Sequence, residues 1–221
     1  GVAEDVLGGS CSYFALAASY FAPVNMVGVI GRDFPRAERD LLASRRINLE
    51  GLEEVDGRTF RWRGRYHEDM NMRDTLDLQL NVFGEFAPRL PESYRDSELV
   101  FLANIQPGLQ KGVLGQLRAV RLVGADTMDH WIRGDRAALV DLLADVDILS
   151  INDSEAQLLS GERNIVVAAR KILEMGPKTL LVKRGEYGAL QFSAGDVFAV
   201  PAFPLETVVD PTGAGDCFAG G

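Results

Sequence analysis

The spacing of hydrophobic positions changes twice along this chain, near residues 48 and 95, and each change indicates a different kind of structure. Before residue 48 the pattern predicts a helix of small residues at about 11–21, an apolar strand at 26–30 and a charged helix at about 35–45. Helices that alternate with strands are typical of an α/β domain.

Residues 48–94 follow a period of two instead. Phe60, Trp62 and Tyr66 alternate with arginines, and a run of leucines after residue 75 alternates with polar residues in the same way. This alternation is typical of strands with one buried face, so we predict a small, mostly β appendage here. The row of arginines is then a solvated strand face.

Beyond residue 95 short apolar runs alternate with helical segments. Helices are predicted at about 109–120, 136–144, 153–160 and 163–175, and strands at 99–103, 121–125, 146–151 and 179–183, before a hairpin of 190–192 with 197–200. This order predicts an α/β fold with a doubly wound, mostly parallel sheet and helices on both faces, built from residues 1–47 and 95–221. Ligands bind such sheets at the carboxyl ends of the strands. The polar residues at those ends are Asn104, Asp126, Asn152, Lys183 and Asp210.

Charge and composition narrow the classes of function. The chain has 221 residues, of which 32 are acidic and 23 are basic, and its formal net charge of −9 argues against a nucleic-acid-binding surface. The longest apolar region, residues 13–30, is interrupted by polar residues and a proline, so it does not predict a membrane span. Cys11 and Cys217 lack metal-ligand spacing. We therefore expect a cytoplasmic protein without a nucleic-acid or membrane partner.

The last stretch of the chain carries the clearest chemistry. Residues 210–216 read Asp-Pro-Thr-Gly-Ala-Gly-Asp, follow the apolar segment 206–209 and lead into small residues that suit a packed helix. A strand, a glycine turn and a helix in this order place backbone N–H groups at a helix N-terminus, and Gly213 and Gly215 would let an anion approach them closely. An anion hole beside the carboxylate of Asp216 suits phosphoryl transfer to an alcohol, whose proton Asp216 would take.

Two other nucleotide-binding loops do not fit this stretch. A P-loop needs Gly-Lys-Ser/Thr, and a dinucleotide loop needs a third glycine where this chain has Phe218. A structural alternative stays open at this point: a tight turn in which Asp216 only favours the positive end of the helix dipole.

The Asp-x-Thr-Gly-Ala-Gly-Asp string resembles the signature of the ribokinase-like (PfkB) carbohydrate kinases. The resemblance implies that Asp216 is the catalytic base and that the backbone of Gly213, Ala214 and Gly215 is the anion hole. It also implies ATP and Mg²⁺ as cofactors. The other motifs of the family follow in the same order, so the resemblance covers nearly the whole chain.

Asn152-Asp153-Ser154-Glu155 combines two compatible roles. The spacing of Asn152 and Glu155 predicts a capping box at the start of a helix. Carboxylate and amide oxygens at a strand end also suit Mg²⁺, usually through water. The family carries an Asn-x-x-Glu motif at this point, which implies that Glu155 and Asn152 organise Mg²⁺ and the phosphates.

Gly185 and Gly188 by themselves are typical of a hairpin turn. In the family a similar Gly-x-x-Gly turn lies under the nucleotide, which implies nucleotide binding by Lys183, Gly185 and Gly188. Lys183 stands where the family often has a small polar residue, and a lysine there would meet a phosphate as a point charge.

Gly8-Gly9 resembles the first signature of the family, in which a glycine pair lies against the sugar. Ser10 and Tyr13 stand where that pattern often has lysine and asparagine. The resemblance implies substrate binding by Gly8 and Gly9, and Asn104 is a further candidate.

The resemblance also concerns cations and partners. Asp210 and Thr212 match positions that help some members hold a monovalent cation near the anion hole, which makes K⁺ a candidate cofactor. The β appendage, residues 48–94, matches the family's lid, which covers the sugar and often mediates dimerisation. A homodimer through this lid is therefore implied.

We predict ATP-dependent phosphorylation of a hydroxymethyl group of a sugar or related polyol. Two alternatives stay open: a nucleoside kinase, for which Tyr13 and Phe34 are candidate stacking partners for a base, and a non-catalytic sugar- or nucleotide-binding relic. The chain begins near the glycine pair and ends about one turn into the last helix. We interpret it as a piece of a longer protein, incomplete at both ends, and expect poor turnover from this chain alone.

Overall fold

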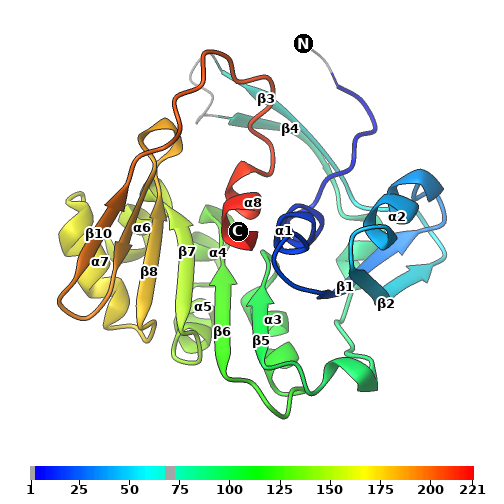
Figure 1. Cartoon of the computed structure of the whole chain (residues 1–221), viewed down its shortest axis with the longest axis horizontal. Helices are drawn as coiled ribbons and strands as arrows, with labels where there is room; N and C mark the ends of the chain where they lie inside the picture. The colour runs from blue at the N-terminus through cyan, green and yellow to red at the C-terminus, as the bar shows by residue number, and fades with distance from the viewer. Residues whose placement is uncertain (1–2, 68–72) are drawn as a thin grey trace. The chain divides into compact units, whose positions relative to one another are not determined.

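The computed structural model describes residues 3–67 and 73–221 (Figure 1). These residues group into two units. The first unit consists of residues 1–92 and 207–221, and the second unit of residues 93–206. This grouping differs from the sequence-based division, which separated residues 1–47 from 48–94. The reason is strand pairing, because β1 (Val24–Gly31) and β2 (Ile47–Val55) are neighbouring parallel strands.

The second unit is built on a six-stranded sheet in the order β10-β9-β8-β7-β6-β5. The strands are β5 (Leu99–Leu102), β6 (Leu122–Asp126), β7 (Ile148–Asn152), β8 (Thr179–Lys183), β9 (Ala189–Phe192) and β10 (Val197–Val200). Strands β5 to β8 are parallel, and β9 and β10 are antiparallel to their neighbours. The predicted mostly parallel α/β sheet is confirmed.

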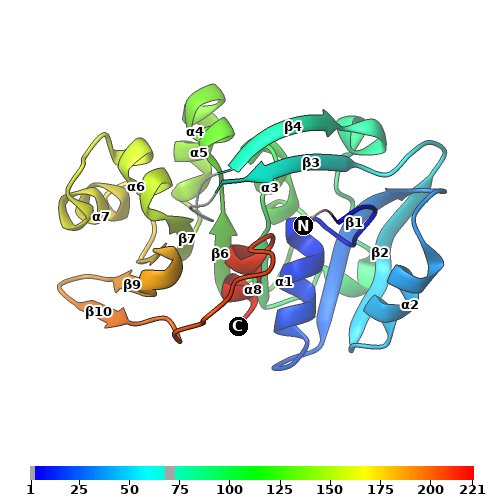
Figure 2. The same cartoon turned by 90° about the horizontal axis from the view of Figure 1, so that it is seen from above.

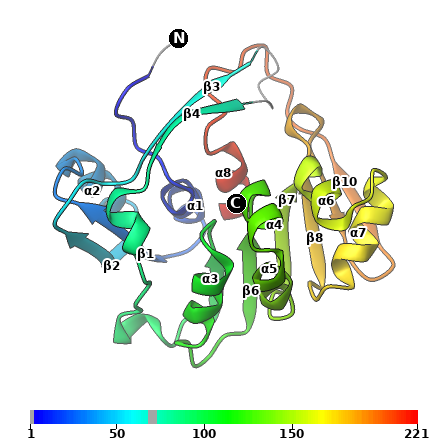
Figure 3. The same ribbon diagram turned by 180° about the vertical axis from the view of Figure 1, so that it is seen from behind.

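Five helices of the second unit cover one face of this sheet, in front of the strands in Figure 3. They are α3 (Pro107–Leu114), α4 (Asp129–Gly134), α5 (Arg136–Leu143), α6 (Asp153–Ser160) and α7 (Ile165–Leu173). Alternate strand residues such as Leu149, Ile151 and Leu180 pack with Leu142 and Ile172 of the helices in one fully buried cluster. Burial of each such side chain contributes about 1.5–3 kcal/mol, so this face dominates the stability of the unit.

Gln110 of α3 joins the ends of two strands, a role that the sequence did not suggest. Its side chain is only 1% exposed. Its Nε2 donates to the carbonyl oxygens of Leu102 and Ala103, both at 3.0 Å, and of Asp126 at 3.2 Å. The amide therefore satisfies backbone carbonyls at the carboxyl ends of β5 and β6.

We expect Gln110→Met to lower the free energy of unfolding by about 1–3 kcal/mol, because these carbonyls would lose a buried donor. Gln157→Met is the matched control, since Gln157 is an exposed residue of α6. Urea unfolding of both variants provides the measurement. Equal midpoints for the two variants would show that the Gln110 amide does not hold these strand ends.

The first unit contains α1 (Ser10–Ala18), α2 (Arg36–Ala43) and α8 (Ala214–Gly220) beside β1 and β2. It also contains an antiparallel ribbon of β3 (Arg61–Tyr66) and β4 (Arg73–Gln79), which confirms a small β element within the predicted appendage. Helices α1 and α8 lie side by side (Figure 2).

The root of the ribbon is fixed to the end of β1 by side-chain hydrogen bonds. Asp33 Oδ1 accepts from both the backbone N–H and the hydroxyl of Thr59, each at 2.7 Å. The same hydroxyl accepts from the N–H of Gly31 at 3.0 Å. The hydrogen bonds from Thr59 lower the pKa of the Asp33 carboxyl, so this anchor is an ionised one at neutral pH.

Three local predictions are wrong. The strand expected at 206–209 is absent, and this exposed segment has no neighbouring strand, because β10 pairs only with β9 among the described residues. Helix α3 ends at Leu114, before Gly115, rather than at residue 120. The run of alternating leucines extends to Leu80, but β4 ends at Gln79. Helix α4 was not predicted at all.

Among the described residues, no helix combines the length and the apolar character that crossing a membrane requires.

Candidate active site

Helices α1 and α8 pack in parallel, with their N-termini at the same end. A Cβ atom on Gly213, at the start of α8, would overlap the ring of Tyr13 in the first turn of α1. A Cβ atom on Gly220, at the other end of α8, would lie 3.0 Å from Cβ of Ala17 near the end of α1. The positive ends of two helix dipoles therefore point the same way. We call residues 8–13 and 210–217 the helix-pair site.

The glycine turn of the helix-pair site has a defined geometry. Gly213 is the N-cap of α8 with φ of 75°, a conformation that disfavours any side chain. The N–H of Ala214 donates to the carbonyl of Pro211 at 3.1 Å. The N–H groups of Gly215 and Asp216 belong to the same first turn of α8. The role of this turn as an anion hole stays a prediction.

Asp210 and Thr212 are joined in the same turn. The backbone N–H of Thr212 donates to Asp210 Oδ1 at 2.9 Å. Hydrogen bonds from the side chain and the backbone of Thr212 lower the pKa of the Asp210 carboxyl. The half-buried Asp216 lies one helical turn further on, in the first turn of α8.

The glycine pair lies at the start of α1. Gly8 and Gly9 are both exposed, and Gly9 is the N-cap of α1 with φ of 93°. The hydroxyl of Tyr13 donates to the carbonyl of Leu7 at 2.9 Å, and its ring packs on Gly213. Burial raises the pKa of Tyr13, and the charges of Asp210 and Asp216 add to this effect. The structure thus brings Gly8, Gly9, Tyr13 and the glycine turn together.

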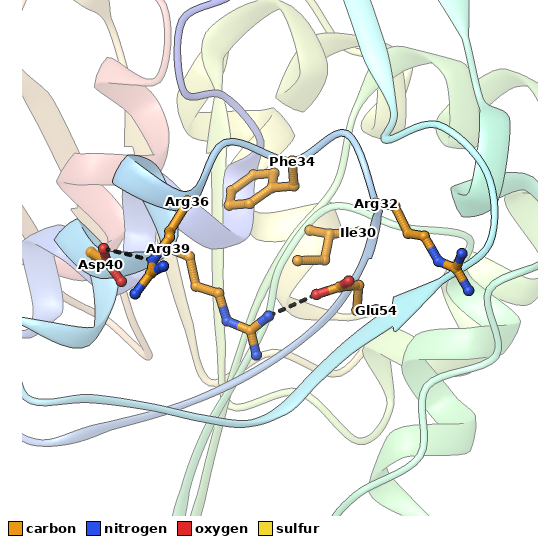
Figure 4. Close-up of a pocket in the computed structure, with 7 residues that line it drawn as sticks. All are labelled: Ile30, Arg32, Phe34, Arg36, Arg39, Asp40 and Glu54. Carbon is orange, nitrogen blue, oxygen red and sulfur yellow. Dashed lines mark hydrogen bonds and ion pairs between the residues drawn. The ribbon is translucent and has the colours of Figure 1, made fainter.

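Phe34, the other candidate for stacking on a base, lines a separate cavity of about 390 Å³ (Figure 4). Three arginines surround this cavity, and each is paired with a carboxylate. The pairs are Arg32 with Asp56 at 3.1 Å, Arg36 with Asp40 at 3.7 Å, and Arg39 with Glu54 at 2.9 Å. Apart from Phe34, none of the candidate residues lines it.

We expect Gly213→Ala to be more destabilising than Gly161→Ala. Both glycines have nearly the same φ, 75° and 74°, but only at Gly213 would the new methyl group overlap a neighbouring side chain. The backbone strain costs about 1–2 kcal/mol at either position, and overpacking against Tyr13 adds roughly 1–3 kcal/mol. Thermal and urea unfolding measure the difference. Equal losses would contradict the contact between Gly213 and Tyr13.

The remaining predicted residues lie at the carboxyl ends of β5 to β8 in the second unit. Here Asn152 Oδ1 accepts from the N–H of Glu155, and Glu155 Oε2 accepts from the N–H of Asn152, both at 2.8 Å. The predicted capping box of α6 is confirmed. A Mg²⁺ role for Asn152 and Glu155 stays a prediction. We call residues 104, 126, 152, 155 and 183 the strand-end site.

Lys183 forms an ion pair with Asp126 in the strand-end site. Its Nζ lies 3.5 Å from Asp126 Oδ2, and the two side chains are only 16% and 8% exposed. Burial raises the pKa of the Asp126 carboxyl, and the positive charge of Lys183 opposes this effect. A phosphate that binds Lys183, as predicted, would therefore share the Lys183 ammonium group with the carboxylate of Asp126.

Asn104, a predicted substrate ligand, is bonded within its own unit. Its Nδ2 donates to the sulfur of Met128 at 3.0 Å, and its Oδ1 accepts from Nε1 of Trp131 at 3.0 Å. This arrangement gives Asn104 a structural role between β5 and α4.

Two buried hydroxyl groups beside the strand-end site lack a hydrogen-bond partner among the described residues. They are Thr127 Oγ1, directly after Asp126, and Ser150 Oγ, whose residue is in register with Asp126 on the next strand. Buried polar atoms almost always have a partner, which in such cases is water or a bound group. These orphaned atoms are consistent with a polar ligand at the strand ends.

Gly185 and Gly188 form the turn between β8 and β9, with φ of 53° and 88°. A Cβ atom on Gly188 would overlap the carbonyl oxygen of Val200. Close packing of the backbone is therefore enough to explain why a glycine occupies position 188. A role of Gly188 in nucleotide binding stays a prediction.

Sequence analysis did not predict a place for Tyr66 in this site. The hydroxyl of Thr212 donates to the hydroxyl of Tyr66 at 3.0 Å. The two residues are 146 positions apart, and no local pattern joins them.

Neither cysteine is an activated thiol. Burial raises the pKa of Cys11 to about 11 and also raises the pKa of Cys217.

A mostly parallel α/β sheet with polar groups at its strand ends, together with a glycine turn beside a carboxylate, is typical of phosphotransferases. Residues 8–221 match the pfkB family of carbohydrate kinases, and the chain belongs to this family.

Three relatives illustrate the likeness. The cytidine kinase of Thermococcus kodakarensis is 31% identical over 97% of this chain and 78% of its own length. The crystal structure of adenosine kinase from Sinorhizobium meliloti matches with a TM-score of 0.84 at 21% identity, over 100% of this chain and 71% of that one. An Escherichia coli protein solved in complex with ATP and Mg²⁺ matches with a TM-score of 0.76 at 22% identity, over 100% and 78%.

Proposed function

We propose that this kinase transfers the γ-phosphoryl group of ATP to a hydroxymethyl group of a small acceptor, and that the acceptor is a nucleoside or, second to it, a free sugar. The observation that carries the proposal is the parallel packing of α1 and α8. It sets the glycine pair Gly8-Gly9 and the turn Gly213–Asp216 at the same end of two helices. The 31% identity to a cytidine kinase supports a nucleoside as the first candidate acceptor.

In this proposal the helix-pair site performs the chemistry on the acceptor. Asp216 takes the proton of the hydroxymethyl group, whose oxygen then bonds to the γ-phosphorus while the bond to the β,γ-bridging oxygen breaks and ADP leaves. The N–H groups of Gly215 and Asp216, with Ala214 beside them, neutralise the charge that develops on the moving phosphoryl group. Gly8 and Gly9 let the acceptor approach the backbone of α1.

The strand-end site, with Gly185 and Gly188, is the proposed nucleotide side. The capping bonds of Asn152 and Glu155 use part of the acceptor capacity of their oxygens, and Mg²⁺ is commonly held by one or two such groups together with phosphates. When bound, Mg²⁺ would supply positive charge that offsets the negative charge of the phosphates. Lys183 adds a fixed positive charge on the same side.

Further proposals concern the remaining predicted partners. Asp210 and Thr212 would help to hold K⁺, which a comparison of rates in KCl and NaCl tests. Residues 48–94 would act as a lid and as a homodimer contact, for which the exposed leucines Leu76, Leu78 and Leu80 of this segment are candidates. Sedimentation equilibrium would show whether the protein is a monomer. A cytoplasmic location stays a prediction.

A coupled ADP-release assay over nucleosides and free sugars, run on the full-length protein, tests the acceptor class. The proposal expects the highest kcat/KM with a nucleoside. Preference for a free sugar would support the second candidate. Binding of acceptor and ATP without any ADP release would instead support the non-catalytic alternative.

We expect Asp216→Asn to lower kcat by roughly two or more orders of magnitude with little change in ATP binding, because the amide cannot accept the proton. Asp196→Asn is the control, since Asp196 is exposed in the turn between β9 and β10. Near-native turnover of Asp216→Asn would leave Asp216 with only its dipole role, which is worth about 0.3–1 kcal/mol of stability.

We expect Glu155→Gln to raise the Mg²⁺ concentration needed for half-maximal rate, because glutamine keeps the capping box but removes the charge. Glu174→Gln, an exposed position after α7, is the control. The measurement is a Mg²⁺ titration at fixed ATP. If the Glu155→Gln curve overlays that of the parent, Glu155 is only a helix cap.

A further inference from the structure

One hydrogen bond joins the ribbon to the glycine turn within the first unit. Tyr66 is the last residue of β3, and its hydroxyl is bonded at 3.0 Å to the hydroxyl of Thr212. Both residues are half-buried. The backbone N–H of the same Thr212 donates to Asp210 Oδ1 at 2.9 Å. The result is a chain of polar groups from the ribbon, through Thr212, to Asp210.

The segment before the turn adds little support to it. The segment before it, residues 201–209, forms no regular structure, and Val209 is 91% exposed. On its other side Gly213 packs against the ring of Tyr13. The turn is thus held by the helix contact at Gly213 and by the hydroxyl of Tyr66 at Thr212. Because Asp216 and the N–H groups of α8 follow directly, the position of the turn sets the position of the anion hole.

Among the described residues, contacts hold the ribbon both at its root and at the end of β3, and Arg61 at the start of β3 also pairs with Asp5 at 2.6 Å. Its root is bonded to β1 through Asp33 and Thr59, and its far end is bonded to the turn through Tyr66. The root also contains Gly57, whose φ of 134° lies in a region that glycine adopts most readily. Movement of the ribbon about its root would therefore break the bond between Tyr66 and Thr212 first.

We propose that Tyr66 is a positioning residue that ties the lid to the anion-hole turn, so that the turn is ordered for phosphoryl transfer only while the lid lies over it. This inference rests on the proposed function and adds a means by which the lid regulates the same site. Tyr66 acts through Thr212 and does not itself take part in the chemistry.

The test is Tyr66→Phe in the full-length protein, which removes the hydroxyl and keeps the ring. A net hydrogen bond of ordinary strength predicts a roughly 3- to 10-fold lower kcat, with the KM values for acceptor and ATP changed less than about 2-fold. Thr212→Val should give a similar or larger loss, Thr212→Ser should restore most of the rate, and Tyr66→Phe should have no further effect in the Thr212→Val background. Tyr20→Phe, at a tyrosine that is 68% exposed, is the matched control.

Hydrogen exchange separates this proposal from the proposed function. Loss of the bond should speed amide exchange at residues 212–216 by roughly 3- to 10-fold in the Tyr66→Phe protein without ligands, whether or not any acceptor is phosphorylated. Three results for Tyr66→Phe would each overturn the role of Tyr66. They are exchange rates equal to those of the parent, a kcat equal to that of an active parent, and a change in KM alone. Absence of turnover in the parent with every acceptor would defeat the proposed function, and the exchange rates would still decide the role of Tyr66.

Discussion

The close contact between α1 and α8 is the interaction on which the candidate site depends. It requires small residues, because a Cβ atom on Gly220 would overlap the carbonyl oxygen of Phe14 and would lie closer to Cβ of Ala17 than an ordinary van der Waals contact. The same contact fixes the parallel direction of the helices and so brings two N-termini to one end. Neither helix is long enough to be stable in isolation, so their mutual packing maintains the geometry of the N–H groups. The small residues therefore serve both the fold and the proposed anion hole.

In the second unit the corresponding constraint is the alignment of the strand ends. Gln110 joins the ends of β5 and β6, and the capping box starts α6 directly after β7. The buried pair of Asp126 and Lys183 is not explained by stability, because desolvation of two charges largely cancels their attraction. A lysine and a carboxylate held in this way at the carboxyl ends of parallel strands are better explained by a polar ligand than by the fold.

Local features were predictable from the sequence, and contacts between distant segments were not. The bounds of β8 and the capping box followed from apolar runs and from residue spacing, which depend on neighbours along the chain. The strand expected at 206–209 failed because a strand also needs a partner, which no local pattern reveals. The bonds of Gln110 and Tyr66 are of the same kind: each depends on how the chain folds back on itself. The glycine motifs predicted the candidate site, whereas the contacts of Gln110 and Tyr66 came only from the structure.

Glycines alone do not separate function from structure in this protein. Gly188 and Gly213 both have steric explanations, since a side chain at either would overlap its neighbours. The carboxylates distinguish the two explanations better. Glutamine would complete the capping box as well as Glu155 does. A negative charge at Asp216 gains only about 0.3–1 kcal/mol of stability from the dipole of α8. The negative charges at these two positions are thus the part of each motif that packing does not require. These two charges support the proposed chemistry at the helix-pair site and the proposed cation binding at the strand-end site more strongly than the glycine pattern does.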